Sequence, residues 1–175
     1  MGSQSLSREW LDFAHMDLSS AEFLLGMHPL PVEIICYHCE QAAEKFLKAV
    51  LIYYGVEAPK THDLVLLCKL CVQLDQSWEQ MIDACVELSP YGVQVRYPSD
   101  MELNESDVSS ALRACRKIGE FVQQQLDFGQ SNAQRNSLGL TFLCKKIQLK
   151  TGKPGGGFTC ICEAAFLILQ GSGSF

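Results

Sequence analysis

Apolar residues recur every three to four positions along most of residues 1–128, which is the period of an amphipathic α-helix. Residues 8–25 follow this pattern first, and Gly26 with the nearby Pro29 ends it. The apolar positions that we expect to face a core are Trp10, Phe13, Ala14, Leu18, Ala21, Leu24 and Leu25.

The clearest helical pattern covers residues 32–54. Pro31 suits the first turn of this helix, and Gly55 suits its end. Its apolar stripe consists of Val32, Ile35, Cys36, Cys39, Ala43, Phe46, Leu47, Val50 and Tyr54.

A third helix is predicted to begin after Thr61-His62-Asp63, with Thr61 or Asp63 as its N-cap. A shorter helix is predicted over 77–87, and residues 88–103 are expected to be irregular because they contain two prolines and a glycine. The buried face of the third helix is expected to contain Leu64, Leu67, Cys68, Cys71, Val72 and Leu74.

Asn104, followed three residues later by Asp107, resembles the capping arrangement of a helix N-terminus. A last amphipathic helix should therefore run from there to about residue 126. Four long helices and a short one, joined by short loops, predict an all-α, antiparallel up-and-down bundle.

The chain changes character after residue 128. Residues 1–128 hold 9 Lys and Arg against 19 Asp and Glu, whereas residues 129–175 hold 5 against 1. We therefore predict a helical domain over 1–128. Residues 129–175 are interpreted as a linker and an unassigned tail, poorly ordered or not native to the domain.

Composition excludes several classes of protein. An acidic domain is a poor non-specific binder of nucleic acid, because phosphate contacts dominate that affinity. No apolar run is long enough to span a membrane, and the N-terminus lacks the apolar region of a signal peptide, so we expect a cytoplasmic protein. The nine cysteines, an odd number, are expected to be mostly small buried residues rather than a disulfide framework.

One polar arc of the second helix is a candidate site. His38, Gln41, Lys45 and Lys48 fall on a narrow arc that lies roughly opposite the apolar stripe. They are either a solvated polar face or a site where imidazole, amide and ammonium groups bind a phosphate or a partner's carboxylate.

Two further segments could carry chemistry. Arg96 and Tyr97 precede Pro98 in the irregular segment, where they could bind phosphate and stack on a base; otherwise they are a surface Arg and a plug for the end of the bundle. His62 and Asp63 are more simply explained as a helix cap.

Neither a metal site nor a cofactor is predicted. Two Cys-x-x-Cys patterns, at Cys36 and Cys68, lie inside helices on their apolar stripes, whereas zinc sites usually place such pairs in turns. The Gly-Lys-Pro-Gly-Gly-Gly stretch in the tail fails the phosphate-loop pattern, because Pro154 follows the lysine.

Three runs together resemble the bacterial HEPN family: CYHCEQAAEKFLKAVLIYYGVEAP, KTHDLVLLCKL and VQVRYPSDMEL. The resemblance covers roughly residues 6–127. It implies an antiparallel helical bundle that forms a homodimer and functions near nucleotides or RNA. It also implies a nucleotidyltransferase partner, as in members that form toxin–antitoxin pairs.

The resemblance carries over to particular residues. Arg96, Tyr97 and Pro98 match the family's Arg-Tyr-Pro variant. The family's characteristic positions on the second helix correspond to His38, Gln41 and Lys45 in this chain. Its Thr-His-Asp-Leu entry to the third helix corresponds to His62 and Asp63.

One departure bears on catalysis. Ribonuclease members carry an Arg and a His separated by four to six intervening residues, and the positions where that His would fall in this chain hold Met101, Glu102 and Leu103. Without that general acid–base, we expect weak or no ribonuclease activity. The favoured function is a module that binds a nucleotide or a nucleotidyltransferase. The alternatives are a divergent metal-independent ribonuclease using His38 or His62, and a helical dimerisation scaffold without a ligand.

Overall fold

The computed structural model describes residues 2–94 and 102–126, and every regular element in these ranges is helical. The all-α fold expected from the sequence is therefore confirmed, whereas the domain boundary at residue 128 and the tail lie outside the described residues. The elements are α1 (Ser3–Leu24), α2 (Val32–Tyr53), α3 (Leu64–Leu74), the 3₁₀ helix η1 (Gln76–Met81), α4 (Ile82–Leu88), α5 (Tyr91–Gln94) and α6 (Glu105–Gln125).

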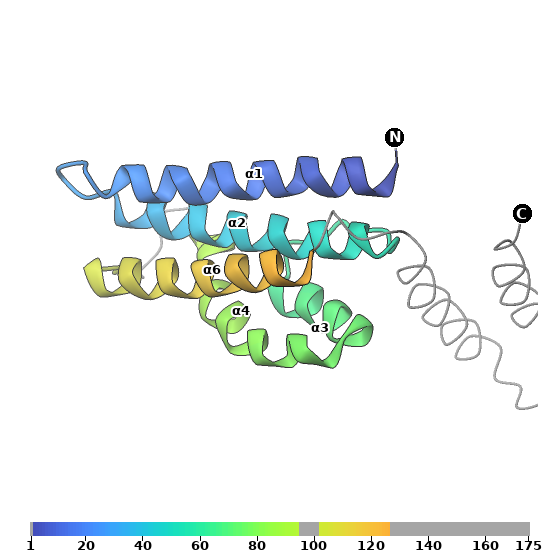
Figure 1. The fold of residues 1–175 in the computed structure, drawn as a ribbon. Coiled ribbons are helices and arrows are strands. Elements are labelled where there is room, and N and C mark those ends of the chain that lie inside the picture. Colours follow the sequence, from blue (N-terminus) through green and yellow to red (C-terminus); the bar gives the residue numbers. More distant parts are fainter. Residues whose placement is uncertain (1, 95–101, 127–175) are drawn as a thin grey trace, which may run out of the picture. The chain divides into compact units, whose positions relative to one another are not determined.

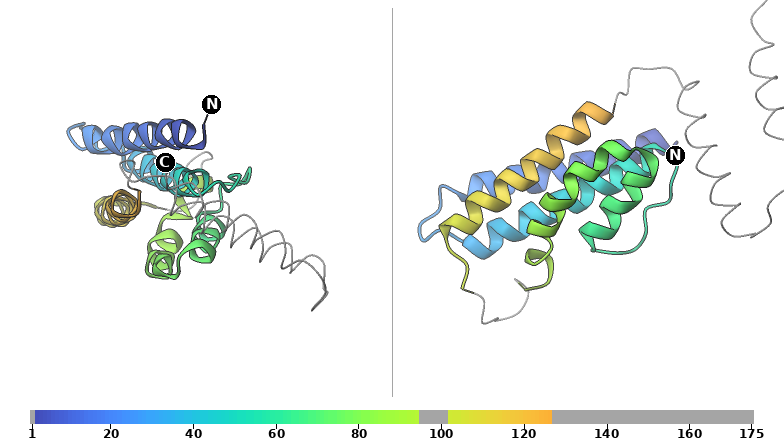
Figure 2. Two further views of the ribbon diagram at one scale, coloured as in Figure 1. Left: turned by 45° about the vertical axis from the view of Figure 1, so that its right-hand side comes forward. Right: turned by 90° about the horizontal axis from the view of Figure 1, so that it is seen from below.

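Helix α2 is the centre of the domain. Helix α1 covers one side of it, while α6, α3 and α4 cover the other (Figures 1 and 2). Fifteen of the 22 residues of α2 are buried, so this helix has almost no face directed at solvent. A helix buried on most sides needs partners for its polar side chains as well as contacts for its apolar ones.

Helix α1 packs on α2 through small side chains. Its fully buried residues are Ser7, Ala14 and Ala21, seven positions apart, and the Ser7 hydroxyl donates a 2.8 Å hydrogen bond to the carbonyl oxygen of Ala49. Small residues at this interval let the two helices approach closely. The large apolar residues of α1 are consequently displaced, and Phe13, which the sequence pattern assigned to the core, is 55% exposed.

Two other expectations need correction. The segment expected to be one short helix over 77–87 is divided into η1 and α4, because the 3₁₀ turns bring Trp78 into the core against Phe121, with ring centroids 4.8 Å apart. The segment 88–103, expected to be irregular, contains the four-residue helix α5. The capping predictions are confirmed: the Asp63 carboxylate accepts from the Leu66 N–H, and Asn104 forms a capping box at α6.

The cysteines of the described residues behave as core residues. Those at positions 36, 39, 68, 71, 85 and 115 are buried and free. Burial raises the pKa of the Cys36 thiol to about 12 and raises that of Cys71 above its usual range as well. Across residues 2–94 and 102–126, no group of His, Cys, Asp or Glu is arranged to hold a metal ion, and no helix is long and apolar enough to cross a membrane.

The capping box predicts a measurable stability effect. Asn104→Ala should lower the free energy of unfolding by about 1 kcal/mol, because it leaves N–H groups of the first turn of α6 without an acceptor. Urea unfolding followed by circular dichroism measures this change. Ser109→Ala, on the exposed side of the same helix, is the matched control and should stay within about 0.5 kcal/mol of the wild type. Equal unfolding midpoints for the two variants would contradict a role for the cap.

Candidate functional site

The Asp17 carboxylate, on α1, joins the predicted polar residues of α2. Lys45 Nζ lies 2.6 Å from Asp17 Oδ2, and His38 Nδ1 lies 3.0 Å from Asp17 Oδ1. Lys45 also donates to the side-chain oxygen of Gln41 at 3.2 Å. The structure thus brings His38, Gln41 and Lys45 together, but it covers them partly with α1. They are not a fully solvated face, because α1 supplies the carboxylate that pairs with Lys45 and shares a hydrogen bond with His38.

The same hydrogen-bond chain continues into the core. Gln41 Nε2 donates to Glu40 Oε2 at 2.9 Å, and the Glu40 side chain is only 1% exposed. Burial is the main cause that raises the pKa of Glu40 to about 7, against the lowering effect of the Gln41 hydrogen bond. A continuous polar path therefore connects the surface imidazole with a buried carboxyl group, in the order His38, Asp17, Lys45, Gln41, Glu40.

Glu40 ends this path against α5. A Cβ atom placed on Gly92 would lie 2.6 Å from Glu40 Oε1, so the buried carboxyl group leaves room only for a glycine there unless it moves. The chain continues from α5 into Arg96, Tyr97 and Pro98, which lie outside the described residues. Their predicted role therefore stays a prediction.

A second buried carboxylate, Glu44, contacts both Lys48 and His62. Lys48 Nζ lies 2.7 Å from Glu44 Oε1, and His62 Nδ1 lies 2.7 Å from Glu44 Oε2. Lys48 is buried rather than part of a solvated arc, and its ammonium lies 5.4 Å from the centre of the Trp10 ring. His62, by contrast, is well exposed, so Glu44 fixes one ring nitrogen while the rest of the imidazole faces solvent. Asp63 next to it acts as the cap of α3.

Sequence reasoning missed the three carboxylates that organise these clusters. Glu40, Glu44 and Lys48 follow one another at intervals of four along α2, so charges at helical spacing within an apolar run were a usable signal that they would need partners. Asp17 gave no comparable signal. Its partners are on another helix, and only the packing of α1 on α2 brings them together.

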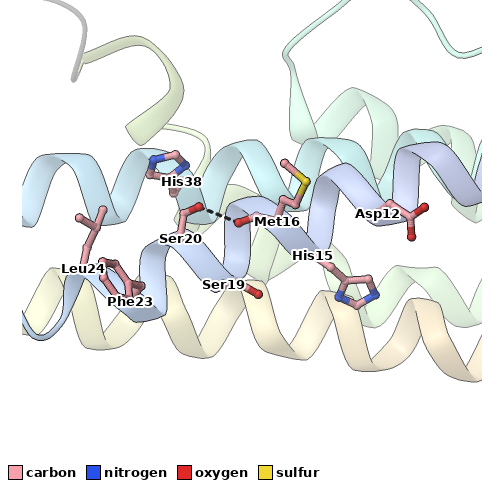
Figure 3. A pocket seen from close by; sticks show the side chains of 8 residues that line it. All are labelled: Asp12, His15, Met16, Ser19, Ser20, Phe23, Leu24 and His38. Carbon is pink, nitrogen blue, oxygen red and sulfur yellow. Dashed lines mark hydrogen bonds between the residues drawn. The ribbon is translucent and has the colours of Figure 1, made fainter.

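An open depression with a volume of about 850 Å³ lies along α1. All but one of its lining residues belong to α1, and they are spread along the helix rather than enclosing a space (Figure 3). The Ser20 hydroxyl donates to the carbonyl oxygen of Met16 within it. The lining residues are Asp12, His15, Met16, Ser19, Ser20, Phe23, Leu24 and His38. This surface resembles an exposed helix face more than a ligand cavity.

Comparison with known proteins agrees with this helical arrangement. The model of the HEPN domain family matches residues 7–125, which includes both carboxylate clusters. The chain belongs to the HEPN family. This confirms the resemblance seen in the sequence.

Two solved structures are similar to this HEPN domain. TT1696 from Thermus thermophilus is 27% identical, with a TM-score of 0.59; the match covers 69% of this chain and 98% of that protein. ST0689, described as an archaeal HEPN homologue, is 20% identical, with a TM-score of 0.55 and the same coverage, which shows the shared fold. Among curated proteins, none matches the chain.

The raised pKa of Glu40 predicts a pH-dependent stability. The folded state retains the proton up to about pH 7, whereas the unfolded chain loses it near the ordinary value of 4.5. The stability that protonated Glu40 contributes is therefore present below about pH 4.5 and is lost as the pH rises through 7. One pKa unit corresponds to about 1.4 kcal/mol, so the loss should be on the order of 3 kcal/mol at most.

Glu40→Gln should remove this component. We expect the variant to lose less stability than the wild type between pH 5 and pH 8, as measured by urea unfolding at each pH. Glu120→Gln, an exposed change on α6, should retain the wild-type dependence. If the free energy of unfolding changed with pH to the same extent in the wild type and in Glu40→Gln, folding would not shift the pKa of Glu40, and the prediction would be wrong.

Proposed function

We propose that this HEPN domain binds a nucleotide, or a nucleotidyltransferase partner that presents one, and does so as a homodimer in the cytoplasm. The observation that carries the proposal is the polar path from His38 to Glu40. Its buried end contacts Gly92, four residues before Arg96. Buried polar groups cost stability, so a path of them that ends at α5 favours a polar ligand near this helix, and Arg96 follows α5 in the sequence.

The chemistry of the proposed site follows from its residue types. The planar guanidinium of Arg96 suits a phosphate, and the Tyr97 ring suits stacking on a base. Lys45 is already paired with Asp17, which also forms a hydrogen bond with His38, so these two side chains would contribute hydrogen bonds more than net charge. The main attraction for an anion is thereby assigned to Arg96. A toxin–antitoxin-like pair with a nucleotidyltransferase is the biological setting that fits this proposal.

Arg96→Ala tests the site directly. Calorimetric titration of the full chain with AMP and with ATP should show binding that the variant loses by about tenfold or more, since a hydrogen bond to a charged group contributes roughly 1.5–3 kcal/mol. Arg113→Ala is the matched control, because Arg113 is exposed on α6 and pairs with Glu87. It should leave the affinity unchanged.

Each other result has a distinct meaning. Equal affinities for Arg96→Ala and the wild type would remove Arg96 from the site. Absence of nucleotide binding by the wild type would contradict the nucleotide half of the proposal, and a pull-down with a minimal nucleotidyltransferase would then test the partner half.

One observation favours the ribonuclease alternative. His62 is held by the Glu44 carboxylate at 2.7 Å while most of its ring is exposed, and a carboxylate that orients an imidazole is a recurrent arrangement in general acid–base catalysis. A His after Arg96 is nevertheless missing, which weighs against catalysis.

We expect purified protein to leave single-stranded RNA intact in the presence of EDTA, as followed by gel electrophoresis. Cleavage that His62→Ala abolishes and His28→Ala retains would overturn this expectation and establish His62 as the base. His28 is a suitable control because it is exposed in the turn between α1 and α2.

A further inference from the structure

The outer face of α1 exposes a continuous stripe of large apolar side chains. The exposed fractions are 55% for Phe13, 62% for Met16 and 81% for Phe23, with Leu6 extending the stripe at 40%. Successive members are seven, three and seven residues apart, which is the spacing of one seam of a coiled coil. The opposite face of α1 already packs on α2 through small residues, so the stripe is additional to the core.

We propose that this stripe binds the same stripe of a second copy of the chain, with the two α1 helices antiparallel. Figures 1 and 2 show no other described element over the outer side of α1, so a second helix can approach it. The inference deepens the homodimer of the proposed function and rests on it, but it does not depend on nucleotide binding.

The exposed area agrees with a weak homodimer. Taking about 200 Å² for a large side chain, the four exposed fractions on α1 amount to roughly 500 Å² per copy. An exposed apolar area of roughly 500 Å² lies in the upper part of the range found for the largest apolar patch of a monomeric protein. Two copies would bury on the order of 1,000 Å², the lower limit for a specific interface. We therefore expect association in the micromolar range rather than an obligate dimer.

Repulsion between like charges favours the antiparallel arrangement over the parallel one. With the seam in antiparallel register, Leu6 faces Phe23 of the second copy and Phe13 faces its Met16, so apolar residues meet apolar residues. Glu9 then faces Ser20 of the second copy. In a parallel pair each residue would face itself, which would place the two Glu9 carboxylates opposite each other. Antiparallel helices also align their dipoles favourably.

Sedimentation velocity of the full chain over a wide micromolar range tests the surface. The wild type should shift from monomer to dimer with increasing concentration, and Phe23→Glu should remain monomeric. Val86→Glu is the matched control: Val86 is 54% exposed on α4, outside the stripe, and the change should leave the dimer intact. Circular dichroism should show both variants folded. A monomeric wild type, or a Phe23→Glu variant that dimerises like the control, overturns the proposal.

Ser20 tests the register. Ser20→Lys should tighten the dimer by about three- to tenfold, since two new ion pairs with Glu9 form, whereas Ser20→Glu should weaken it. In a parallel pair Ser20 would face itself, and either charge would weaken association; that result overturns the antiparallel arrangement. Phe23→Glu should still bind AMP or ATP with wild-type affinity, so a failure of this interface and a failure of the nucleotide site give different results.

Discussion

The burial of α2 on nearly all sides is the constraint on which the rest of the domain depends. Charged side chains in the buried part of a central helix cannot reach water, so they need partners on the same helix or on a neighbouring element. Asp17 on α1 and His62 before α3 supply those partners. Ion pairs, and not apolar contacts alone, therefore determine how α1 and the segment leading to α3 are placed against the central helix.

This constraint changes the meaning of the polar residues on α2. A lysine and a histidine on one arc resemble an anion site when only the sequence is considered. In the folded domain an incoming phosphate would compete with a carboxylate that already lies 2.6 Å from Lys45. The arc thus has an architectural role first, and any ligand role must share it. The unbalanced positive charge needed to attract a phosphate must come from elsewhere in the chain, for which Arg96 is the candidate.

Much of the fold could be predicted because its signals are local. Period, caps and a terminating glycine identified α2, α3 and α6, and three runs of sequence taken together indicated the family. The buried face of α1 was predicted only in part, because both of its faces carry apolar residues. Ala14 and Ala21 were expected in the core and are buried, whereas Phe13 and Leu25 are exposed and the buried Ser7 was not foreseen. Asp17 was missed for a related reason: its partners lie on another helix, and no spacing rule connects them.

The buried thiols have a consequence of their own. Alkylating reagents must reach a thiol to react with it, so a buried thiol reacts only when its helix detaches from the bundle. Cys36 on α2, Cys71 on α3 and Cys115 on α6 occupy three different helices. The native chain thus carries built-in reporters of local opening, and their relative labelling rates would reveal which helix leaves the central one first.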